Sequence, residues 1–304
     1  MPGNPCPDGA LVGTVTTADG IRLRFARWPA RGVAKGTVCV FTGRSEAIEK
    51  YFETIGELLA RGFAVAAMDW RGQGHSQRLV ADPVPGHVER YADYEQDLAA
   101  FMQGVVLPNC PRPYIGLAHS MGGTVLLRAA RAGECWFDRL ALLAALVDLP
   151  RRSVGSVLRT LIKAARRTGF GHSGVPGSNV DRSRAKGFPG NPLTTDPERY
   201  ARNAALIAAD PALVVGSPTF AWLDATFDAV TEFRRADYAA RITQPVLMVA
   251  AGGDTIVSTP AIKAFAARLS KGTLCVIEGA RHEVLQEQDK YRAEFWEAFD
   301  EFIG

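Results

Sequence analysis

The sequence has few cysteines, and they follow no pattern. Five occur in 304 residues, with no CxxC pair and no metal-ligand spacing among them. An odd, unpatterned set of this kind is typical of a protein that folds in a reducing compartment. A chain of this length can bury enough apolar surface to fold without covalent cross-links. Disulfide bonds are therefore not expected.

Long apolar runs are also absent from the sequence. The longest, at 140–147, is far shorter than the roughly 20 residues that a membrane span requires. Residues 1–13 lack the basic region and apolar core of a secretory signal peptide. We therefore expect a cytoplasmic protein, either free in solution or peripheral at the inner membrane surface.

Apolar runs and helical periodicity alternate along most of the chain. Buried strands are expected at 37–41, 64–68, 114–118, 140–147, 246–250 and 273–277. Helices are expected at 47–60, 88–106, 124–132, 261–269 and 290–302. This alternation predicts an α/β fold in which helices flank both faces of a mostly parallel central sheet. A hairpin pattern over 11–26 precedes it.

Residues 150–232 interrupt the alternation. They combine helical stretches with a segment rich in Gly, Pro and Ser at 169–192. We expect a mainly helical cap, or lid, at 150–232, inserted into a core domain formed by 1–149 and 233–304. Ligands of open α/β sheets bind at the carboxyl ends of the strands, so an insertion that leaves from there lies over the site.

A serine stands between the expected strand at 114–118 and the expected helix at 124–132. Ser120 has small residues two positions before and two positions after it, Ala118 and Gly122. This pattern is typical of a nucleophile elbow, where the flanking chains nearly touch and a larger side chain would force them apart. The turn also directs the amide N–H of Met121 toward a developing oxyanion.

The partners of this serine are expected downstream, because the order in this architecture is Ser, then Asp or Glu, then His. His282 follows the last expected strand, whereas His172, the other downstream histidine, lies in the insertion. We expect His282 to be the general base and Asp254, which follows the strand at 246–250, to be the acid that orients it. Three other aspartates remain as alternatives to this acid: Asp148, Asp224 and Asp228.

A second oxyanion donor is expected in the loop that follows the strand at 37–41. The N–H of Arg44 is the expected donor, with Gly43 allowing the turn. The side chain of Arg44 is a weaker candidate for contact with an anionic group of a substrate. The remaining histidines have no metal-ligand spacing, so neither a metal nor a cofactor is predicted.

At these motifs the sequence resembles the α/β-hydrolase fold serine hydrolases of the bacterial lysophospholipase and monoacylglycerol lipase family. The resemblance is carried by 41–46 (FTGRSE), 69–76 (DWRGQGHS), 118–123 (AHSMGG), 253–254 (GD) and 279–282 (GARH). Segments of the insertion resemble the lysophospholipase branch in particular: 191–194 (NPLT), 199–203 (RYARN), 210–211 (DP) and 216–219 (GSPT). The sequence departs from the family pattern at two positions. Thr42 stands where monoglyceride lipases usually carry His, and Ala118 stands where the elbow usually has Gly. The departure at Thr42 favours the lysophospholipase branch.

The resemblance implies an α/β-hydrolase fold with Ser120, Asp254 and His282 as catalytic triad and with Met121 and Arg44 as oxyanion donors. It implies a serine carboxylester hydrolase that cleaves single-chain lipids, either lysophospholipids or monoacylglycerols. A small-molecule carboxylesterase or thioesterase of the same fold is the alternative. A non-catalytic binding protein is disfavoured, because no member of the triad is missing. The head group, the acyl length and the oligomeric state stay open.

Positive charge is concentrated in the insertion. Residues 151–204 hold eleven Lys and Arg against three acidic residues, whereas the whole chain has a net charge of +3. Helical periodicity separates apolar from basic side chains there: Val154, Val157, Leu158, Leu161 and Ala165 against Arg159, Lys163 and Arg166. A basic amphipathic helix of this kind can lie on an anionic membrane. The alternative is an apolar face packed on the core with solvated cations. No aromatic residues interleave with the charges, so no nucleic-acid partner is expected.

Overall fold

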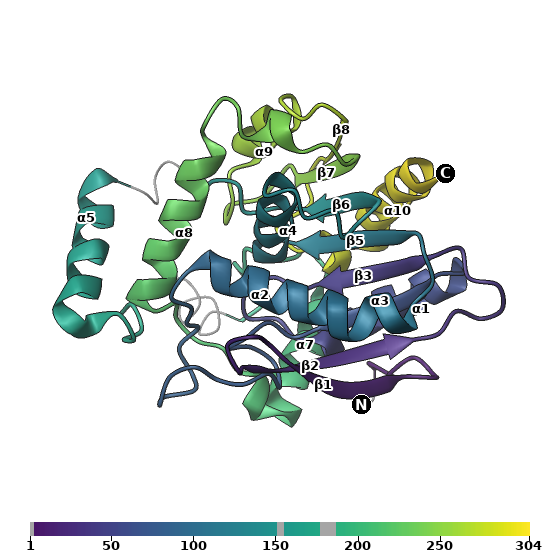
Figure 1. Ribbon diagram of the computed structural model, residues 1–304, viewed down its shortest axis with the longest axis horizontal. Coiled ribbons are helices and arrows are strands. Elements are labelled where there is room, and N and C mark those ends of the chain that lie inside the picture. Colours follow the sequence, from purple (N-terminus) through teal and green to yellow (C-terminus); the bar gives the residue numbers. More distant parts are fainter. Residues whose placement is uncertain (1–2, 151–154, 177–186) are drawn as a thin grey trace.

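An eight-stranded sheet forms the centre of the computed structural model, which describes residues 3–150, 155–176 and 187–304 (Figure 1). The strand order is β1-β2-β4-β3-β5-β6-β7-β8. Strands β1 and β2 pair antiparallel, as do β2 and β4, and all other pairs are parallel. The bounds are β1 (Leu11–Thr16), β2 (Arg22–Trp28), β3 (Thr37–Phe41), β4 (Ala64–Met68), β5 (Tyr114–His119), β6 (Arg139–Leu143), β7 (Val246–Ala251) and β8 (Gly272–Ile277). The predicted mostly parallel α/β sheet is confirmed.

Helices cover both faces of the sheet, and the side chains of each central strand alternate between two cores. In β3, Cys39 and Phe41 face the core beneath the helices drawn in front of the sheet in Figure 1, whereas Val38 and Val40 face the core on the other side. The first core is covered by α2 (Tyr91–Phe101), α4 (Met121–Arg131) and α9 (Thr259–Ala266). The second is covered by α1 (Phe52–Ala60) and α10 (Asp289–Ile303). Burial on both faces explains why the central strands are continuous apolar runs.

Three shorter segments adjoin the core helices. The 3₁₀ turn η1 (Ile48–Tyr51) precedes α1, and α2 continues through the π-helical turn η2 (Met102–Val106) into α3 (Leu107–Asn109). The 3₁₀ turn η7 (Val284–Gln286) lies between β8 and α10. The two helices predicted at 47–60 and 88–106 are therefore each a composite of two helical types.

The apolar run at 140–147 does not form one long strand, as the sequence predicted. Strand β6 ends at Leu143, and the next residue, Ala144, has a φ of 45° that takes it out of the sheet. Residues 144–147 are nevertheless buried, because they pack beside Ser120, whose carbonyl oxygen accepts from Leu146 N at 3.1 Å. The run is apolar because this segment is buried, not because it pairs with a neighbouring strand.

The chain between β6 and β7 forms the inserted helices. They are α5 (Ser156–Ala165), the π-helical turn η4 (Arg166–Phe170), α7 (Pro197–Ala209), the 3₁₀ turn η5 (Pro211–Leu213), α8 (Phe220–Phe233) and the 3₁₀ turn η6 (Ala239–Arg241). Figure 1 shows α5 and α8 side by side beyond one end of the sheet, with α5 outermost. Thr219 begins α8 by accepting from Trp222 N at 3.1 Å. None of the helices in the described ranges combines the length and the apolar character needed to cross a bilayer.

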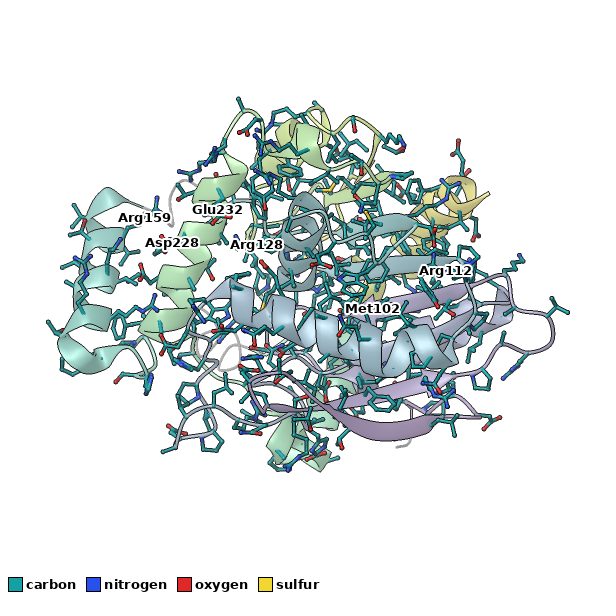
Figure 2. All side chains as sticks on the ribbon, viewed as in Figure 1. Met102, Arg112, Arg128, Arg159, Asp228 and Glu232 are labelled. Carbon is teal, nitrogen blue, oxygen red and sulfur yellow. The ribbon has the colours of Figure 1, made fainter. Side chains whose placement is uncertain are left out.

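Arginines join α8 to its neighbours on both sides. Arg159 of α5 donates to the carbonyl oxygen of Phe227 at 3.1 Å and to Thr231 Oγ1 at 2.7 Å (Figure 2). On the other side, Arg128 of α4 forms an ion pair with Glu232 of α8. Helix α8 therefore connects the outer helix of the insertion to the sheet-covering layer.

Candidate active site

Ser120 has a strained backbone at the junction of β5 and α4. Its φ of 50° and ψ of −114° lie in a region that L-residues rarely adopt, and such conformations cost about 1–3 kcal/mol. Hydrogen bonds from two neighbouring segments hold it there. Ser120 N donates to the carbonyl oxygen of Leu143 at 2.9 Å, and its own carbonyl oxygen accepts from Leu146 N at 3.1 Å. Strain that is held in this way is typical of a nucleophile elbow.

The small residues after the serine are required by close backbone approach. A Cβ on Gly122 would lie 2.8 Å from the carbonyl oxygen of Thr42 and 2.9 Å from that of Phe41. A Cβ on Gly123 would lie 2.8 Å from the Cβ of Ala145. A larger side chain at Gly122 would push α4 away from the loop that follows β3, and one at Gly123 would push it away from the segment that follows β6.

The three residues predicted to form the triad lie in one hydrogen-bonded line. His282 Nε2 is 3.0 Å from Ser120 Oγ, and His282 Nδ1 is 2.7 Å from Asp254 Oδ2. A carboxylate accepts only, so Nδ1 carries the proton and Nε2 presents its lone pair to the serine hydroxyl. This arrangement suits proton transfer from Ser120 to His282.

The carboxylate of Asp254 is held in place from its other oxygen. Asp254 Oδ1 accepts from Ile256 N at 2.7 Å and from Val257 N at 3.1 Å. Burial acts to raise the pKa of Asp254, but the charge and hydrogen bond of His282 and the two amide donors outweigh it and lower that pKa. The carboxylate therefore stays ionised beside the imidazole.

The alternative acids have other partners. Asp148 forms an ion pair with Arg234 at 2.8 Å, and Asp224 forms one with Arg166 at 2.9 Å. Asp228 is exposed on α8. The downstream histidine in the insertion, His172, contacts Glu89 at 3.1 Å. The geometry thus favours Asp254 and His282 over the alternatives.

The two expected oxyanion donors lie at the start of α4 and in the loop that follows β3. Met121 is the first residue of α4, where an N–H has no partner within the helix. Arg44 lies in the loop after β3, and its guanidinium donates to the carbonyl oxygen of Gly216 and lies 5.2 Å from the ring centroid of Trp222. The side chain of Arg44 therefore contacts the insertion, and its contact with a substrate anion stays a prediction.

A buried charged network beneath the site was not recognised in the sequence. Glu46 accepts from Lys50 Nζ at 2.8 Å, from Tyr51 Oη at 2.6 Å and from Gly43 N at 2.5 Å. Lys50 also pairs with Glu283 at 2.6 Å, next to His282 in the chain. Burial acts to raise the pKa of Glu46, but His119 and Lys50 outweigh it and hold that pKa well below its usual range. The sequence signal for this network was the presence of Glu46 and His119 inside the motifs at 41–46 and 118–123.

His119 links this network to the base. Its Nδ1 lies 3.2 Å from Glu46 Oε2, and its Nε2 lies 3.1 Å from the carbonyl oxygen of His282. Burial acts to lower the pKa of His119, but the charge and hydrogen bond of Glu46 outweigh it and raise that pKa. Both ring nitrogens face acceptors, so the imidazolium, which donates from both, fits this position.

The mostly parallel sheet and the strained serine after β5 define an α/β-hydrolase. The family model described as serine aminopeptidase, S33 matches residues 32–289, and the chain belongs to that family. It is 34% identical to lysophospholipase L2 of Escherichia coli, over 95% of this chain and 86% of that protein. It is 23% identical to the monoacylglycerol lipase of Mycolicibacterium smegmatis, over 89% of both. The predicted relationship to bacterial lysophospholipases and monoacylglycerol lipases is confirmed, and the chain is a hydrolase with carboxylic ester hydrolases among its relatives.

Solved structures show the same fold. A monoglyceride lipase from Saccharomyces cerevisiae superposes with a TM-score of 0.74 at 17% identity and covers 96% of both chains. A carboxyl esterase from Bacillus coagulans superposes with a TM-score of 0.76 at 18% identity, over 98% of this chain and all of that one. The predicted α/β-hydrolase fold is confirmed.

Proposed function

We propose that this hydrolase cleaves the acyl ester of a single-chain lipid, a lysophospholipid or a monoacylglycerol, through an acyl-enzyme on Ser120. The observation that carries the proposal is the contact of His282 Nε2 with Ser120 Oγ at 3.0 Å, backed by Asp254. The identity to E. coli lysophospholipase L2 along nearly the whole chain supports the choice of lipid substrate.

The reaction begins when His282 Nε2 takes the hydroxyl proton and Ser120 Oγ attacks the ester carbonyl carbon. The amide N–H groups of Met121 and Arg44 donate to the oxyanion that forms, and Asp254 stabilises the imidazolium. His282 then gives its proton to the leaving glycerol oxygen, and the acyl group stays on Ser120. In the second half, His282 takes a proton from water, the hydroxide attacks the acyl carbon, and the proton returns to Ser120 as the fatty acid leaves.

A small-molecule carboxylesterase is the second candidate, which the likeness to the Bacillus coagulans carboxyl esterase supports at the level of the fold. A fluorophosphonate probe and a substrate panel distinguish the possibilities. Labelling that disappears in Ser120→Ala supports a serine hydrolase, and no labelling of the wild type contradicts it. Faster turnover of lysophospholipids or monoacylglycerols than of short p-nitrophenyl esters supports the lipid substrate, and the reverse order supports the small-molecule esterase.

We also propose that residues 150–232 act as a cap whose outer helix contacts a lipid surface. In α5, Val157 is 71% exposed and Leu161 is 61% exposed, and Phe170, at the end of η4, is 58% exposed. The alternative in which this apolar face packs on the core is therefore wrong for Val157 and Leu161. Val154, which was predicted on the same face, lies outside the described residues. Exposed apolar side chains at the rim of a lipid hydrolase suit insertion among lipid chains.

The amphipathic pattern predicted that the basic residues of α5 and η4 all face solvent, and two of them do not. Arg159 contacts α8, and Arg166 pairs with Asp224 and Glu89 at 2.9 Å. Lys163 and Arg167 are exposed. Two of the predicted surface cations therefore stabilise the insertion, and the proposed membrane contact rests more on apolar than on charged side chains.

A further inference from the structure

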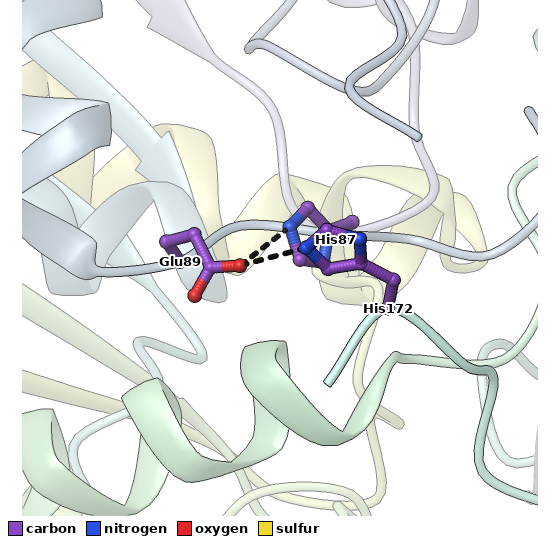
Figure 3. A group of neighbouring side chains, drawn as sticks. All are labelled: His87, Glu89 and His172. Carbon is purple, nitrogen blue, oxygen red and sulfur yellow. Dashed lines mark hydrogen bonds and ion pairs between the residues drawn. The ribbon is translucent and has the colours of Figure 1, made fainter. Parts of the chain in front are cut away.

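Two histidines and a glutamate converge where the insertion meets the core (Figure 3). Glu89 Oε1 lies 3.3 Å from His87 Nε2 and 3.1 Å from His172 Nε2. The three atoms that would bind a metal all lie within 4.8 Å of one another. His87 and Glu89 come just before α2, whereas His172 follows η4 in the insertion. We propose that His87, Glu89 and His172 form a binding site for a divalent transition-metal ion, with Zn²⁺ as its best fit.

The two separations from Glu89 suit a tetrahedral ion, and the third, between the two imidazoles, lies within 4.8 Å and closes if the exposed His172 side chain turns. Zinc binds His nitrogen and carboxylate oxygen at about 2.0–2.2 Å, so two ligand atoms of one tetrahedral site lie roughly 3.3–3.5 Å apart. The two separations from Glu89 Oε1, 3.3 Å and 3.1 Å, need little change to reach that value. Imidazole and carboxylate ligands together favour zinc and its transition-metal neighbours over Mg²⁺ or Ca²⁺.

Neighbouring groups orient two of the ligands. His87 Nδ1 lies 3.0 Å from Thr219 Oγ1, so a proton on Nδ1 has an acceptor and Nε2 is left with a lone pair for the ion. Glu89 Oε2 accepts from Arg166 at 2.9 Å, which leaves Oε1 to face the two imidazoles. The positive charge of Arg166 opposes a cation here, but it is bonded to the oxygen that the ion does not use.

The site is open on one side. The side chain of His87 is 4% exposed, whereas those of Glu89 and His172 are 46% and 69% exposed. An ion can therefore enter from solvent, and a water can complete the four ligands. Because the ligands come from both the core and the insertion, a bound ion would join the two beside Thr219, the residue that caps the start of α8.

The test uses the purified full-length protein after chelator treatment and dialysis. Competition with a chromophoric chelator measures Zn²⁺ stoichiometry, and Co²⁺ substitution reports ligand geometry through its d–d absorption. The variants are His172→Ala and Glu89→Gln, whose side chains are exposed, so both are expected to fold. The matched control is His75→Ala, which removes another exposed histidine, bonded to Asp210 at 2.7 Å.

We expect one equivalent of Zn²⁺ and tetrahedral Co²⁺ absorption in the wild type and in His75→Ala. We expect at least a tenfold loss of Zn²⁺ affinity in His172→Ala and in Glu89→Gln. Zinc should raise the Tm of the wild type and of His75→Ala, but not that of the other two variants. Absence of stoichiometric binding by the wild type would overturn the proposal, as would equal affinity in His172→Ala. These readouts do not depend on esterase activity.

Discussion

His119 Nε2 donates to the carbonyl oxygen of His282 at 3.1 Å, and the two rings lie 4.8 Å apart. The residue before the proposed nucleophile thus holds the loop that carries the proposed base. Its other nitrogen contacts Glu46, which in turn accepts from the backbone of Gly43 in the expected oxyanion loop. One buried network therefore contacts all three segments of the candidate site.

His119→Ala is expected to lower kcat/KM about tenfold to a hundredfold, because it removes a contact that positions the loop of His282, and a small misplacement of a catalytic group can cost about a hundredfold. The loss should appear in kcat more than in KM, because His119 holds the loop of His282 through its carbonyl oxygen. A smaller folded fraction with unchanged kcat per folded molecule would mean that His119 has only a structural role.

Ser120→Ala and His282→Ala are each expected to lower kcat by about 10⁴–10⁶-fold, leaving only the effects of the oxyanion donors and of binding. The two residues act as one unit in the proposed mechanism. The double variant should therefore be hardly worse than either single variant. If the losses measured by single-turnover and steady-state kinetics were additive, Ser120 and His282 would not act together in one mechanism.

Asp254→Asn is expected to lower kcat about 10⁴-fold, because the amide cannot hold His282 in the required tautomer. Its Tm should stay within a few degrees of the wild type, since the amide keeps the size of the carboxylate. Asp148→Asn is the matched control, because Asp148 pairs with Arg234 and not with the base. An active Asp254→Asn beside an inactive Asp148→Asn would reverse the assignment of the acid.

Glu53 of α1 joins the core to α7 by accepting from Arg199 and Arg202 at 2.6 Å. Burial acts to raise the pKa of Glu53, but these hydrogen bonds and the charge of Arg292 outweigh it and lower that pKa from 4.5 to about 2. A carboxyl group with a lowered folded-state pKa adds stability above its unfolded value and loses it as the pH falls through the folded value.

Glu53→Gln should therefore be less stable than the wild type at pH 7, and the difference should shrink between pH 4.5 and about 2. Chemical denaturation across that range measures it. Asp300→Asn, which removes an exposed pair with Arg61, is the control and should change little at any pH, because solvent screens that pair. A stability difference for Glu53→Gln that is independent of pH would contradict the ionic role.

The double variant Val157→Ser/Leu161→Ser is expected to bind lipid vesicles more weakly than the wild type, because it removes exposed apolar area from α5. Co-sedimentation with neutral and anionic vesicles at low and high salt measures this. Leu274→Ser on β8 is the control, since Leu274 is also exposed, at 42%, but lies outside the insertion. Equal sedimentation of wild type and double variant with both vesicle types would reject the proposed contact.

The sequence by itself determined the elements whose causes are local. The elbow follows from Ser120 and the small residues beside it, because a sharp turn constrains its immediate neighbours. The parallel sheet follows from apolar runs that alternate with helices. The order along the chain then selected Ser120 and His282, whereas the choice of Asp254 among four candidate aspartates also needed its place after a strand.

Only the tertiary structure decided which distant side chains meet. His87 and His172 have no motif spacing because the contact depends on how the insertion packs on the core. Periodicity separated Arg159 from the apolar face of α5 but did not reveal that the basic face is the one that contacts α8. The network from Glu46 through His119 to His282 joins the loop after β3, the end of β5 and the loop after β8. Such contacts depend on the packing of elements far apart in the chain, which local sequence patterns do not encode.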